Sequence, residues 1–420
     1  MKKYLFDLDN TIADTSEIKI YRKSAEGMEY LAENIDKFNI YYNPKITNLI
    51  NKLNEKGKIS IITNAPLNYA KAILKKGEFS ESIPIYSNMK KPIPTKIYFE
   101  LKRKINPNET IVIGNSPKDI IAAHGYIEDF AGYEWPETFN LPSAGVIFKR
   151  ENEKIRLKKA IKLNKAEPNK ILKNTEDLEE LVDEFESGKI TYQRRKSIDE
   201  YFFISKQELP EKDIKIEIFY LGNYYPKDKF PDMNKKDAFS QHLLRFKRAQ
   251  DCPIENINDR IIDKYFFNGQ IRGIYTYWHS IKFFLEKAED RIDEMNLKGK
   301  TEVIASPNSY PEYCYDTDVN QAFARKLNND CFNISETKRI VYRVFPKEKH
   351  SRGIENHLKT IGIEKTALSH IQTLNNIIIF DDNITSGSQI KAIAYLLRQK
   401  CNFQGNIYGL TLGKTVGSMQ

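Results

Sequence analysis

The chemistry that this chain could perform is first suggested by two carboxylates near its N-terminus. Asp7 and Asp9 directly follow the short apolar segment Tyr4–Phe6, in the run Asp7-Leu8-Asp9-Asn10-Thr11. Two carboxylates separated by one residue, in a loop that leaves a strand, can point the same way, so that one attacks a phosphorus atom while the other moves protons. Because they would repel each other when both are ionised, a divalent cation that prefers oxygen, such as Mg²⁺, is the expected partner.

Three later segments carry groups that suit the same task. The apolar run Ile59–Ile62 ends in Thr63 and Asn64, whose hydroxyl and amide can hold phosphate oxygens. Lys91 can neutralise a transferring phosphoryl group. The run Ile111–Ile113 leads into a polar loop that places Asp119 at the mouth of an expected helix, as a metal ligand.

This ordered set resembles the haloacid-dehalogenase (HAD) superfamily of phosphatases, whose four motifs are a DxDxT loop, a Thr or Ser after the second strand, a Lys and an acidic GDxxxD loop. The resemblance covers about residues 1–148. It implies that Asp7 is the nucleophile that forms an aspartyl-phosphate, and that Asp9 protonates the leaving oxygen and later activates water. It further implies that Thr63 and Lys91 hold the phosphoryl group, and that Asp7, the Asp9 carbonyl and Asp119 bind Mg²⁺.

The sequence departs from this family pattern at the metal site. Asn115 stands where the family usually has Asp, so the site keeps an oxygen ligand but loses one negative charge, and we expect weaker Mg²⁺ binding. About 50 residues separate the first two motifs, which allows only a small cap. Such an open site suits a bulky substrate or a macromolecular end. Four tyrosines of this segment either line the site or, as we expect for most of them, pack between helices: Tyr21, Tyr30, Tyr41 and Tyr42.

A second candidate site lies near the C-terminus. The apolar run Ile377–Phe380 is followed by Asp381 and Asp382, and then by Thr385, Ser386, Gly387 and Ser388, after which we expect a helix. A strand, a short loop with glycine and a helix N-terminus make an anion site, because backbone N–H groups and the helix dipole point at the anion. Adjacent carboxylates suit sugar hydroxyls, so the combination predicts a bound sugar phosphate.

This stretch resembles the motif DDxxTTGxT of type I phosphoribosyltransferases, which bind phosphoribosyl pyrophosphate (PRPP). Ser386 replaces the second Thr, and Gln389 stands where the last Thr is common. The resemblance implies that Asp381 and Asp382 contact the ribose hydroxyls and that Thr385, Ser386, Gly387 and Ser388 bind the 5′-phosphate. The resemblance further implies that the loop Ser306-Pro307-Asn308-Ser309 binds the pyrophosphate and that a basic loop covers it. The basic loop contains Lys347, Lys349, His350 and Arg352, and its alternative interpretation is an ordinary charged surface loop.

The elements that must position both sites alternate between strand and helix. Strands expected at Lys3–Phe6, Lys58–Ile62 and Thr110–Ile113 are each followed by a helical stretch, the pattern of a parallel sheet covered by helices. The predicted fold class is α/β with two doubly wound parallel-sheet domains, the first HAD-like with a small cap and the second phosphoribosyltransferase-like. Residues 1–148 form the first domain, 149–211 a charged helical connector, and 212–420 the second domain.

Composition narrows the classes of protein that remain. The net charge is +9 and the pI is near 9.0, which suits anionic partners and permits nucleic acid without requiring it. The longest apolar runs are far shorter than the roughly 20 residues of a membrane span, so no membrane association is expected. The four cysteines form no CxxC pair, which fits a cytoplasmic protein. Isolated His242, His279 and His370 are expected to be structural.

Together these features predict a bifunctional enzyme, in which a Mg²⁺-dependent phosphatase acting on a nucleotide or sugar phosphate is joined to a PRPP-binding transferase. Two alternatives remain open at this point. The C-terminal domain could sense PRPP or a nucleotide and regulate the phosphatase without catalysis. The protein could also be a phosphatase that processes nucleic-acid ends. The acceptor base would be read by a variable segment, residues 212–300, in which no motif is recognisable.

Overall fold

The structure is a computed structural model that describes residues 1–92, 108–126, 138–147, 153–174, 176–191, 199–204, 214–248, 271–315, 318–347 and 353–417. The chain divides into two compact units, Met1–Lys196 and Ser197–Gln420. Each unit is described by itself.

The first unit is built on a six-stranded sheet in which every pair of neighbouring strands is parallel. The strand order is β10-β9-β6-β1-β4-β5. The strands are β1 (Lys3–Phe6), β4 (Ile59–Ile62), β5 (Ile85–Tyr86), β6 (Thr110–Gly114), β9 (Ser143–Val146) and β10 (Lys170–Leu172). The apolar character of β1 follows from its central place, because Tyr4 and Phe6 enter the core on one face and Leu5 enters it on the other.

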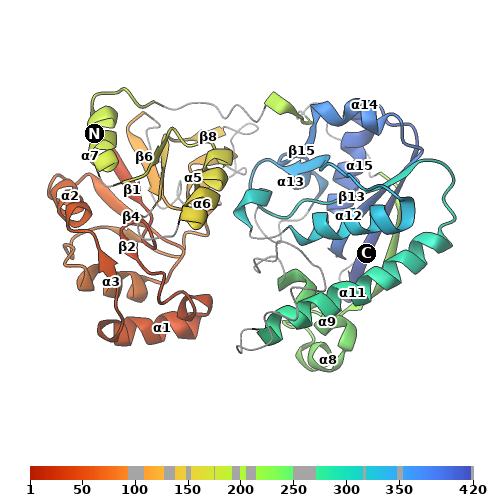
Figure 1. Cartoon of the computed structure of the whole chain (residues 1–420), viewed down its shortest axis with the longest axis horizontal. Coiled ribbons are helices and arrows are strands. Elements are labelled where there is room, and N and C mark those ends of the chain that lie inside the picture. The colour runs from red at the N-terminus through yellow and green to blue at the C-terminus, as the bar shows by residue number, and fades with distance from the viewer. Residues whose placement is uncertain are drawn as a thin grey trace. The chain divides into compact units, whose positions relative to one another are not determined.

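Helices cover both faces of this sheet (Figure 1). Helices α2 (Pro44–Glu55), α3 (Leu67–Lys76) and α7 (Glu176–Glu186) pack on the face of Tyr4 and Phe6. The opposite face carries α5 (Pro117–Ala122), with α6 (Glu153–Lys165) beside it. Helix α2 shows why these segments are helical, since it buries Ile46, Ile50 and Leu53, which recur at helical spacing, while its N-cap Asn43 accepts from the Lys45 N–H.

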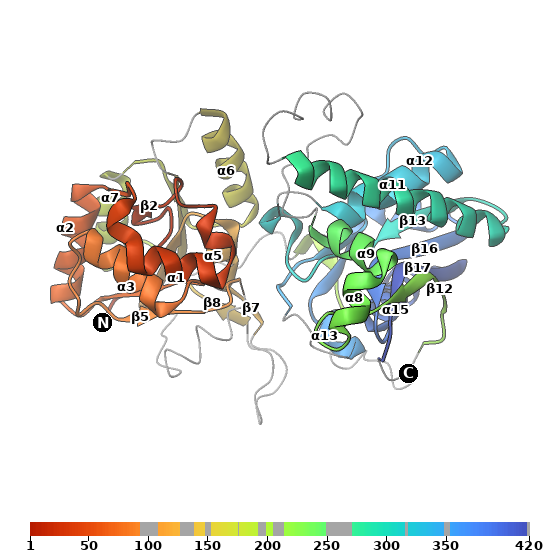
Figure 2. The same cartoon turned by 90° about the horizontal axis from the view of Figure 1, so that it is seen from below.

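A short segment between β1 and β4, residues 13–42, occupies the place where the sequence predicts a small cap, and we refer to it as the cap. Strands β2 (Ala13–Asp14) and β3 (Tyr41–Tyr42) pair antiparallel, and the segment between them holds η1 (Tyr21–Lys23), α1 (Ala25–Asn34) and η2 (Ile35–Lys37). Helix α1 packs on α3 (Figure 2). Tyr21 stacks on Tyr30 at 5.8 Å between ring centroids, so these two tyrosines pack within the cap. A short pair, β7 (His124–Tyr126) and β8 (Thr138–Asn140), completes the described strands of this unit.

The segment expected to be a connector, 149–211, contributes most of its length to the first unit. Strand β10 pairs with β9, and Leu178, Leu181 and Phe185 of α7 lie in the same core as Tyr4. The Tyr4 hydroxyl also donates to Glu186 Oε1 at 2.9 Å. The predicted end of the first domain at residue 148 is therefore corrected to Lys196, because the apolar side of α7 packs on the sheet while only its acidic side is solvated.

The second unit contains a four-stranded parallel sheet in the order β12-β17-β16-β13. Its strands are β12 (Glu217–Tyr224), β13 (Thr301–Ala305), β16 (Asn376–Ile384) and β17 (Asn406–Thr415). One face packs against α9 (Ala238–Arg248), α11 (Ile271–Glu294) and α12 (Val319–Phe332), and the other against α13 (Ile354–Leu358) and α15 (Ser388–Cys401) (Figure 2). This part of the unit agrees with the predicted parallel α/β pattern.

A three-stranded antiparallel sheet departs from that prediction. Strands β11 (Tyr201–Phe202), β15 (Ile361–Glu364) and β14 (Val341–Arg343) pair in the order β11-β15-β14. The second unit is therefore not purely a parallel, doubly wound domain. The remaining described elements are α8 (Pro231–Lys236), η6 (Glu312–Cys314), η7 (Lys365–Ala367) and α14 (Leu368–Ile371).

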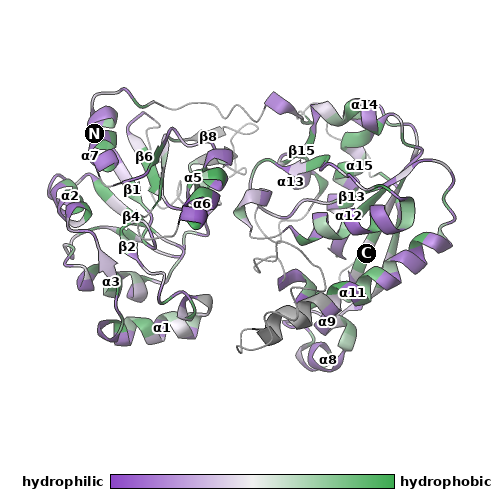
Figure 3. Cartoon of the chain, in the orientation of Figure 1, coloured by the Kyte–Doolittle hydropathy of each residue, from purple (hydrophilic) through white to green (hydrophobic). Residues whose placement is uncertain are grey.

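Hydropathy follows the layers of both units. The strands are mostly hydrophobic, whereas the helices show both a hydrophobic and a hydrophilic side (Figure 3). Among the described residues, none of the helices combines the length and the apolar character that crossing a bilayer requires.

Candidate active site

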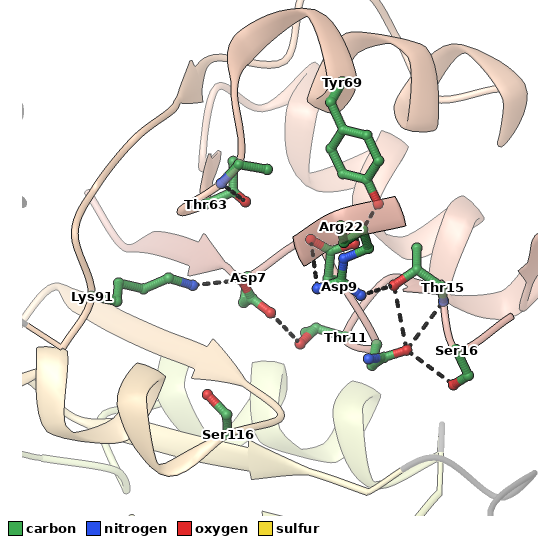
Figure 4. Close-up of polar contacts among 12 residues, drawn as sticks. Asp7, Asp9, Thr11, Thr15, Ser16, Arg22, Thr63, Tyr69, Lys91 and Ser116 are labelled. Atoms are coloured by element: carbon green, nitrogen blue, oxygen red, sulfur yellow. Dashed lines mark hydrogen bonds and ion pairs between the residues drawn. The ribbon is translucent and has the colours of Figure 1, made fainter. Parts of the chain in front are cut away.

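The loop that leaves β1 carries Asp7 at the carboxyl end of the central strand. The Asp7 N–H donates to the Ile113 carbonyl at 2.8 Å, so the backbone stays aligned with β6 for one residue beyond β1. The Asp7 side chain is buried, and its Oδ2 accepts from the Thr11 hydroxyl at 3.2 Å. The first motif thus supports its own carboxylate from within the same loop (Figure 4).

Lys91 connects the two carboxylates predicted to form the metal site. Its Nζ lies 2.5 Å from Asp7 Oδ1 and 2.5 Å from Asp119 Oδ1, and it donates to the Ile62 carbonyl at 3.1 Å. Asn64 holds the Lys91 backbone through two hydrogen bonds, of 2.7 and 3.1 Å. Asn64 therefore positions the lysine. Asp7 and Asp119, which lie 84 and 28 positions from Lys91 in the sequence, thus meet at its buried ammonium group.

Asp119 is fixed by the first turn of α5. Its Oδ2 accepts from the Ser116 N–H at 3.0 Å and from the Ser116 hydroxyl at 2.7 Å, which is a capping arrangement at the N-terminus of the helix. Gly114 makes the approach possible, because a Cβ at that position would lie 2.3 Å from the Asp119 Cβ. The strand end and the helix start are therefore in direct contact through a position that only glycine fits.

Burial and the positive charge of Lys91 shift the pKa of Asp7 in opposite directions. Burial raises the pKa of Asp7 to about 7, the nearby Asp119 carboxylate adds to the rise, and Lys91 opposes it. Burial also favours the neutral amine of Lys91, but Asp119 and Asp7 outweigh it and hold the pKa of this ammonium above its usual value. One lysine thus only partly compensates two buried carboxylates, and further positive charge would be favourable here.

Asp9 lies beside this cluster and is held by residues from two other elements. Tyr69 on α3 donates its hydroxyl to Asp9 Oδ1 at 2.8 Å, and Arg22 in η1 places Nη2 3.3 Å from Asp9 Oδ2 (Figure 4). Sequence reasoning did not single out Tyr69 or Arg22. No local pattern marks them, because they lie 60 and 13 residues from Asp9 on a helix and in the cap.

Thr63 and Asn115 complete the predicted set. Thr63 is buried at the end of β4, the strand next to β1, and its hydroxyl accepts from the Ala65 N–H at 3.1 Å. Asn115 directly follows β6 and is partly exposed. Every predicted residue of the first site therefore lies at the carboxyl ends of three adjacent strands, β6, β1 and β4, or in a segment that contacts them.

The donor set of this edge fits a hard divalent cation. Asp7 and Asp119 approach the same ammonium group, and both Asp7 oxygens and Asp119 Oδ1 each accept one of the hydrogen bonds given above, so each keeps a lone pair. Asn115, the residue after β6, carries an amide oxygen of the kind that such a cation prefers. Among the described residues, no group of three or more His, Cys, Asp or Glu side chains is arranged to hold a metal. With Asn115 in place of a third carboxylate, the donors match Mg²⁺ in kind and carry less charge.

A cavity of about 460 Å³ borders Thr11 in the first unit. It is mainly apolar, and its lining includes Phe6, Tyr41, Leu172 and Leu178. This volume lies within the range of small-ligand pockets. Of the four tyrosines considered above, Tyr41 is the one that lines this cavity.

The second predicted site begins inside a strand. Strand β16 runs through Ile384, so Asp381 and Asp382 belong to the strand and not to a loop, which corrects the predicted end at Phe380. Consecutive side chains on a strand point to opposite faces. Accordingly, Asp381 lies beside Ser306, whereas Asp382 Oδ2 lies 3.5 Å from Lys247 Nζ of α9. The two carboxylates therefore have different surroundings.

The expected glycine loop and helix are present directly after this strand. Thr385 and Ser386 are exposed, Gly387 has a positive φ of 72° as N-cap, and α15 starts at Ser388. The Ser386 and Ser388 hydroxyls lie 2.7 Å apart. Three exposed or partly exposed hydroxyls thus surround the N-terminus of a 14-residue helix.

Burial raises the pKa of the Asp381 carboxyl to about 7, and the adjacent Asp382 adds to the rise, while Ser306 and Lys247 oppose it. Thr411, the residue paired with Asp381 on β17, is fully buried, and its hydroxyl has no hydrogen-bond partner within the part of the chain that the structure describes. A desolvated carboxylate with a neighbouring unpaired hydroxyl is typical of a binding site.

Gln389 and Arg343 join the neighbouring loop to α15. Gln389 donates to the Pro307 carbonyl at 2.8 Å and accepts from Arg343 Nη2 at 2.9 Å. Arg343 also donates to the Asn308 carbonyl at 2.9 Å and to the Thr360 hydroxyl. The loop Ser306–Ser309 is therefore fixed against α15, and Gln389 serves this contact. Sequence reasoning missed Arg343, which lies on the unpredicted antiparallel sheet.

The predicted basic loop is described only at its start. Lys347 is buried, and its N–H donates to the Ser309 carbonyl at 2.8 Å, while Lys349, His350 and Arg352 lie outside the described residues. His357, which the sequence did not highlight, is buried nearby, and burial together with Arg343 and Lys347 lowers its pKa to about 2. The loop Ser306–Ser309 is thus contacted by the Arg343 guanidinium and by the Lys347 backbone.

Of the three histidines expected to be structural, His242 and His370 contact neighbouring side chains, and His279 is exposed on α11. His242 stacks on Phe283 at 4.6 Å between ring centroids, and its Nδ1 lies 2.9 Å from the Ser280 hydroxyl. His370 contacts the buried Glu302 carboxylate.

Among known proteins, the chain resembles several solved structures, but only weakly. The sequence matches no protein-family model and no curated protein. The structure is similar to a beta-phosphoglucomutase from Clostridium difficile (TM-score 0.30, 19% identity, 44% of this chain and 98% of that chain). It is also similar to the putative HAD-hydrolase YfnB from Bacillus subtilis, which is bound to magnesium (TM-score 0.28, 14% identity, 43% and 98%). DsGPDH of Dunaliella salina matches 98% of this chain and 57% of its own length (TM-score 0.27, 10% identity). At these values none of the likenesses says what this chain does.

Proposed function

We propose that the first unit is a Mg²⁺-dependent phosphatase of the HAD type that acts on a nucleotide or sugar phosphate through an aspartyl-phosphate at Asp7. One observation carries this proposal. Lys91 bridges Asp7 and Asp119 at 2.5 Å each, at the edge where parallel strands end and α/β proteins bind their ligands. The burial of all three side chains concentrates charge where a phosphoryl group would need it.

In the first step an Asp7 oxygen forms a bond to phosphorus while the bond from phosphorus to the leaving oxygen breaks. Asp9 gives its proton to that oxygen. In the second step a water attacks the same phosphorus, Asp9 takes the water proton, and the Asp7 carboxylate leaves. Thr63 and Lys91 bind phosphoryl oxygens throughout.

The residues that would hold Mg²⁺ are Asp7, the Asp9 main-chain carbonyl, Asn115 and Asp119. When bound, the ion would supply positive charge against the oxygens of the phosphoryl group. The chain's own contribution is to keep Asp7 and Asp119 close together, to orient Lys91 through Asn64, and to shield the Asp7 carboxylate from bulk water.

Phosphate release tests this proposal. With Mg²⁺, the protein should release phosphate from p-nitrophenyl phosphate or from members of a nucleoside monophosphate panel. Asp7→Asn should lower the rate at least about 10³-fold, because the amide cannot act as the nucleophile. Asp36→Asn, an exposed substitution in the cap, is the matched control and should leave the rate unchanged. Failure of the protein to act on a broad phosphate panel would remove the proposal.

For the second unit we propose a PRPP-binding, phosphoribosyltransferase-like function. It is supported by the glycine turn at the start of α15, the hydroxyls of Thr385, Ser386 and Ser388, and the desolvated Asp381. Because Asp381 and Asp382 face opposite sides of the sheet, we expect Asp381 to contribute more to sugar binding. Asp381→Asn should weaken PRPP binding, measured by calorimetry, by more than tenfold, and Asp232→Asn on the exposed part of α8 should not.

Catalysis and sensing by the second unit differ in their products. A transferase should release pyrophosphate from PRPP when a suitable base is added. PRPP binding without pyrophosphate release across a panel of bases would instead favour a sensor that regulates the phosphatase.

A further inference from the structure

The predicted acid–base residue Asp9 is held on both carboxylate oxygens by side chains that no motif includes. Tyr69 donates to Oδ1 at 2.8 Å, and Arg22 lies 3.3 Å from Oδ2. Arg22 also donates from Nη1 to the Thr15 hydroxyl at 2.6 Å, and the Thr15 N–H donates to Asn10 Oδ1 at 3.1 Å. Figure 4 shows Tyr69 and Arg22 converging on Asp9, away from the Asp7–Lys91 contact.

We propose that Tyr69 is a positioning residue for Asp9, and that Arg22 assists it from the cap. The two side chains fix the carboxylate in the orientation from which it exchanges a proton with the leaving oxygen. The inference rests on the proposed phosphatase function, and it adds two residues and a cap contact that neither the motifs nor the comparisons assign.

The Tyr69 hydroxyl contributes something that packing alone does not explain. The Tyr69 ring is 1% exposed and belongs to the core of the first unit, where a phenylalanine would fill the same space. A buried tyrosine hydroxyl needs a hydrogen-bond partner, and this one has the Asp9 carboxylate. Tyr42 is also near Asp9, but its hydroxyl donates to the Ile73 carbonyl at 2.7 Å. Of these two neighbouring tyrosines, Tyr69 is the one bonded to the carboxylate.

Arg22 makes the position of Asp9 depend on the cap. It lies in η1, within the segment between β2 and β3 that forms the cap, and its guanidinium contacts Thr15 and Asp9 at the same time. A guanidinium is always charged and only donates, so this contact stays attractive whenever Asp9 is ionised. The cap thereby restrains the same carboxylate that α3 restrains through Tyr69.

The role predicts a specific kinetic signature. As the bond between phosphorus and the leaving oxygen breaks, the proton moves from Asp9 to that oxygen. An alkoxide leaving group needs this proton, whereas p-nitrophenolate leaves readily without it. Misplacing a catalytic group by about 1 Å can cost about 10²-fold in rate. Loss of the Tyr69 hydroxyl should therefore slow an alkyl phosphate far more than p-nitrophenyl phosphate.

The test compares kcat/KM, which reports the steps up to departure of the leaving group, for β-glycerophosphate and p-nitrophenyl phosphate. Tyr69→Phe should lower the value about 10- to 100-fold for the first substrate and less than about 3-fold for the second. Arg22→Gln should show the same pattern. In an Asp9→Asn background, Tyr69→Phe should cause no further loss, because the group that it positions is gone.

Tyr4→Phe is the matched control. It also removes a buried tyrosine hydroxyl bonded to a carboxylate in the same unit, that of Glu186, and it should leave both substrates unaffected. Equal losses of Tyr69→Phe on both substrates, no loss on either, or a loss that adds to that of Asp9→Asn would each overturn the inference and leave the phosphatase proposal intact. Absence of activity in the wild-type protein on both substrates would overturn the two together.

Discussion

At the scale of single residues, the first site depends on how one ammonium group stabilises two buried carboxylates. Lys91 contacts Asp7 and Asp119 at the same distance, and all three side chains are buried. Removing one partner of a buried charge pair typically costs about 3–5 kcal/mol, because it leaves charge uncompensated in a low-dielectric environment. The lysine is therefore expected to matter for folding as well as for phosphate binding.

Lys91→Met should lower the free energy of unfolding by about 3 kcal/mol and abolish phosphate release. Added Mg²⁺ should restore part of the stability, because the ion offsets the repulsion between Asp7 and Asp119. Urea unfolding with and without Mg²⁺ measures both effects. Lys90→Met, which changes the exposed neighbour, is the control and should respond to neither. Equal stability of Lys91→Met and wild type would contradict this view of the charge cluster.

Asp381 gives the second unit a pH dependence with a defined sign. Its folded-state pKa is about 7, above the usual unfolded value near 3.9, so the folded state binds more protons between these values. Stability should therefore fall as pH rises from about 4 to 7. Asp381→Asn removes this loss and should raise the Tm of the second unit by a few °C at pH 8 relative to wild type, with little difference at pH 4.

Thermal unfolding at pH 4, 6 and 8 checks this expectation, with Asp232→Asn as an exposed control. A destabilisation of Asp381→Asn that is equal at all three pH values would show that the carboxyl is not protonated on folding.

At the scale of elements, the meeting of α5 with β6 positions Asp119. Gly114→Ala would bring a Cβ within 2.3 Å of the Asp119 Cβ, so α5 would have to shift. We expect at least a 100-fold loss of phosphate release together with a lower Tm. Gly145→Ala on the neighbouring strand β9 is the matched control, because its Cβ would meet the Leu163 side chain at 3.0 Å, and that side chain can move. Similar activities of the two variants would contradict the proposed role of this contact.

The elements also explain which parts of the sites could be predicted. Asp7, Thr63 and Asp119 could be placed together because each follows a strand of one parallel sheet, whose carboxyl ends share an edge. Tyr69 and Arg22 could not, because their direction depends on how α3 and the cap pack. The sequence predicts that the strand β16 ends at Phe380. The strand continues to Ile384 because it pairs there with β17, a strand that the sequence analysis does not predict.

At the scale of the whole molecule, the boundary of the first unit is the clearest difference from the expectation. The sequence predicts a charged helical connector over residues 149–211. The apolar residues of α7 recur at helical spacing, but the sequence does not show that they pack on the sheet, because the contact joins Phe185 to Tyr4 across more than 180 residues. The charged residues predict the solvent-exposed side of α7, whereas the packing of its apolar side on the sheet makes the helix part of the first unit.

Truncation tests this boundary. Residues 1–196 should unfold in one cooperative transition. Residues 1–148 lack β10 and α7 and expose the core around Tyr4 and Phe6, so they should show no cooperative transition and should bind hydrophobic dyes. Thermal unfolding followed by near-UV circular dichroism distinguishes these results. An equal Tm for the two fragments would contradict the assignment of α7 to the first unit and would favour a connector.

The most direct test of the central claim is to look for the phosphoryl group on Asp7. The protein would be mixed with Mg²⁺ and p-nitrophenyl phosphate, quenched in acid within its first turnovers and analysed by peptide mass spectrometry. We expect a phosphoryl adduct on the peptide that contains Asp7, absent from Asp7→Asn and present in Asp36→Asn. Phosphate release with no adduct on Asp7, or an equal adduct in Asp7→Asn, would contradict it.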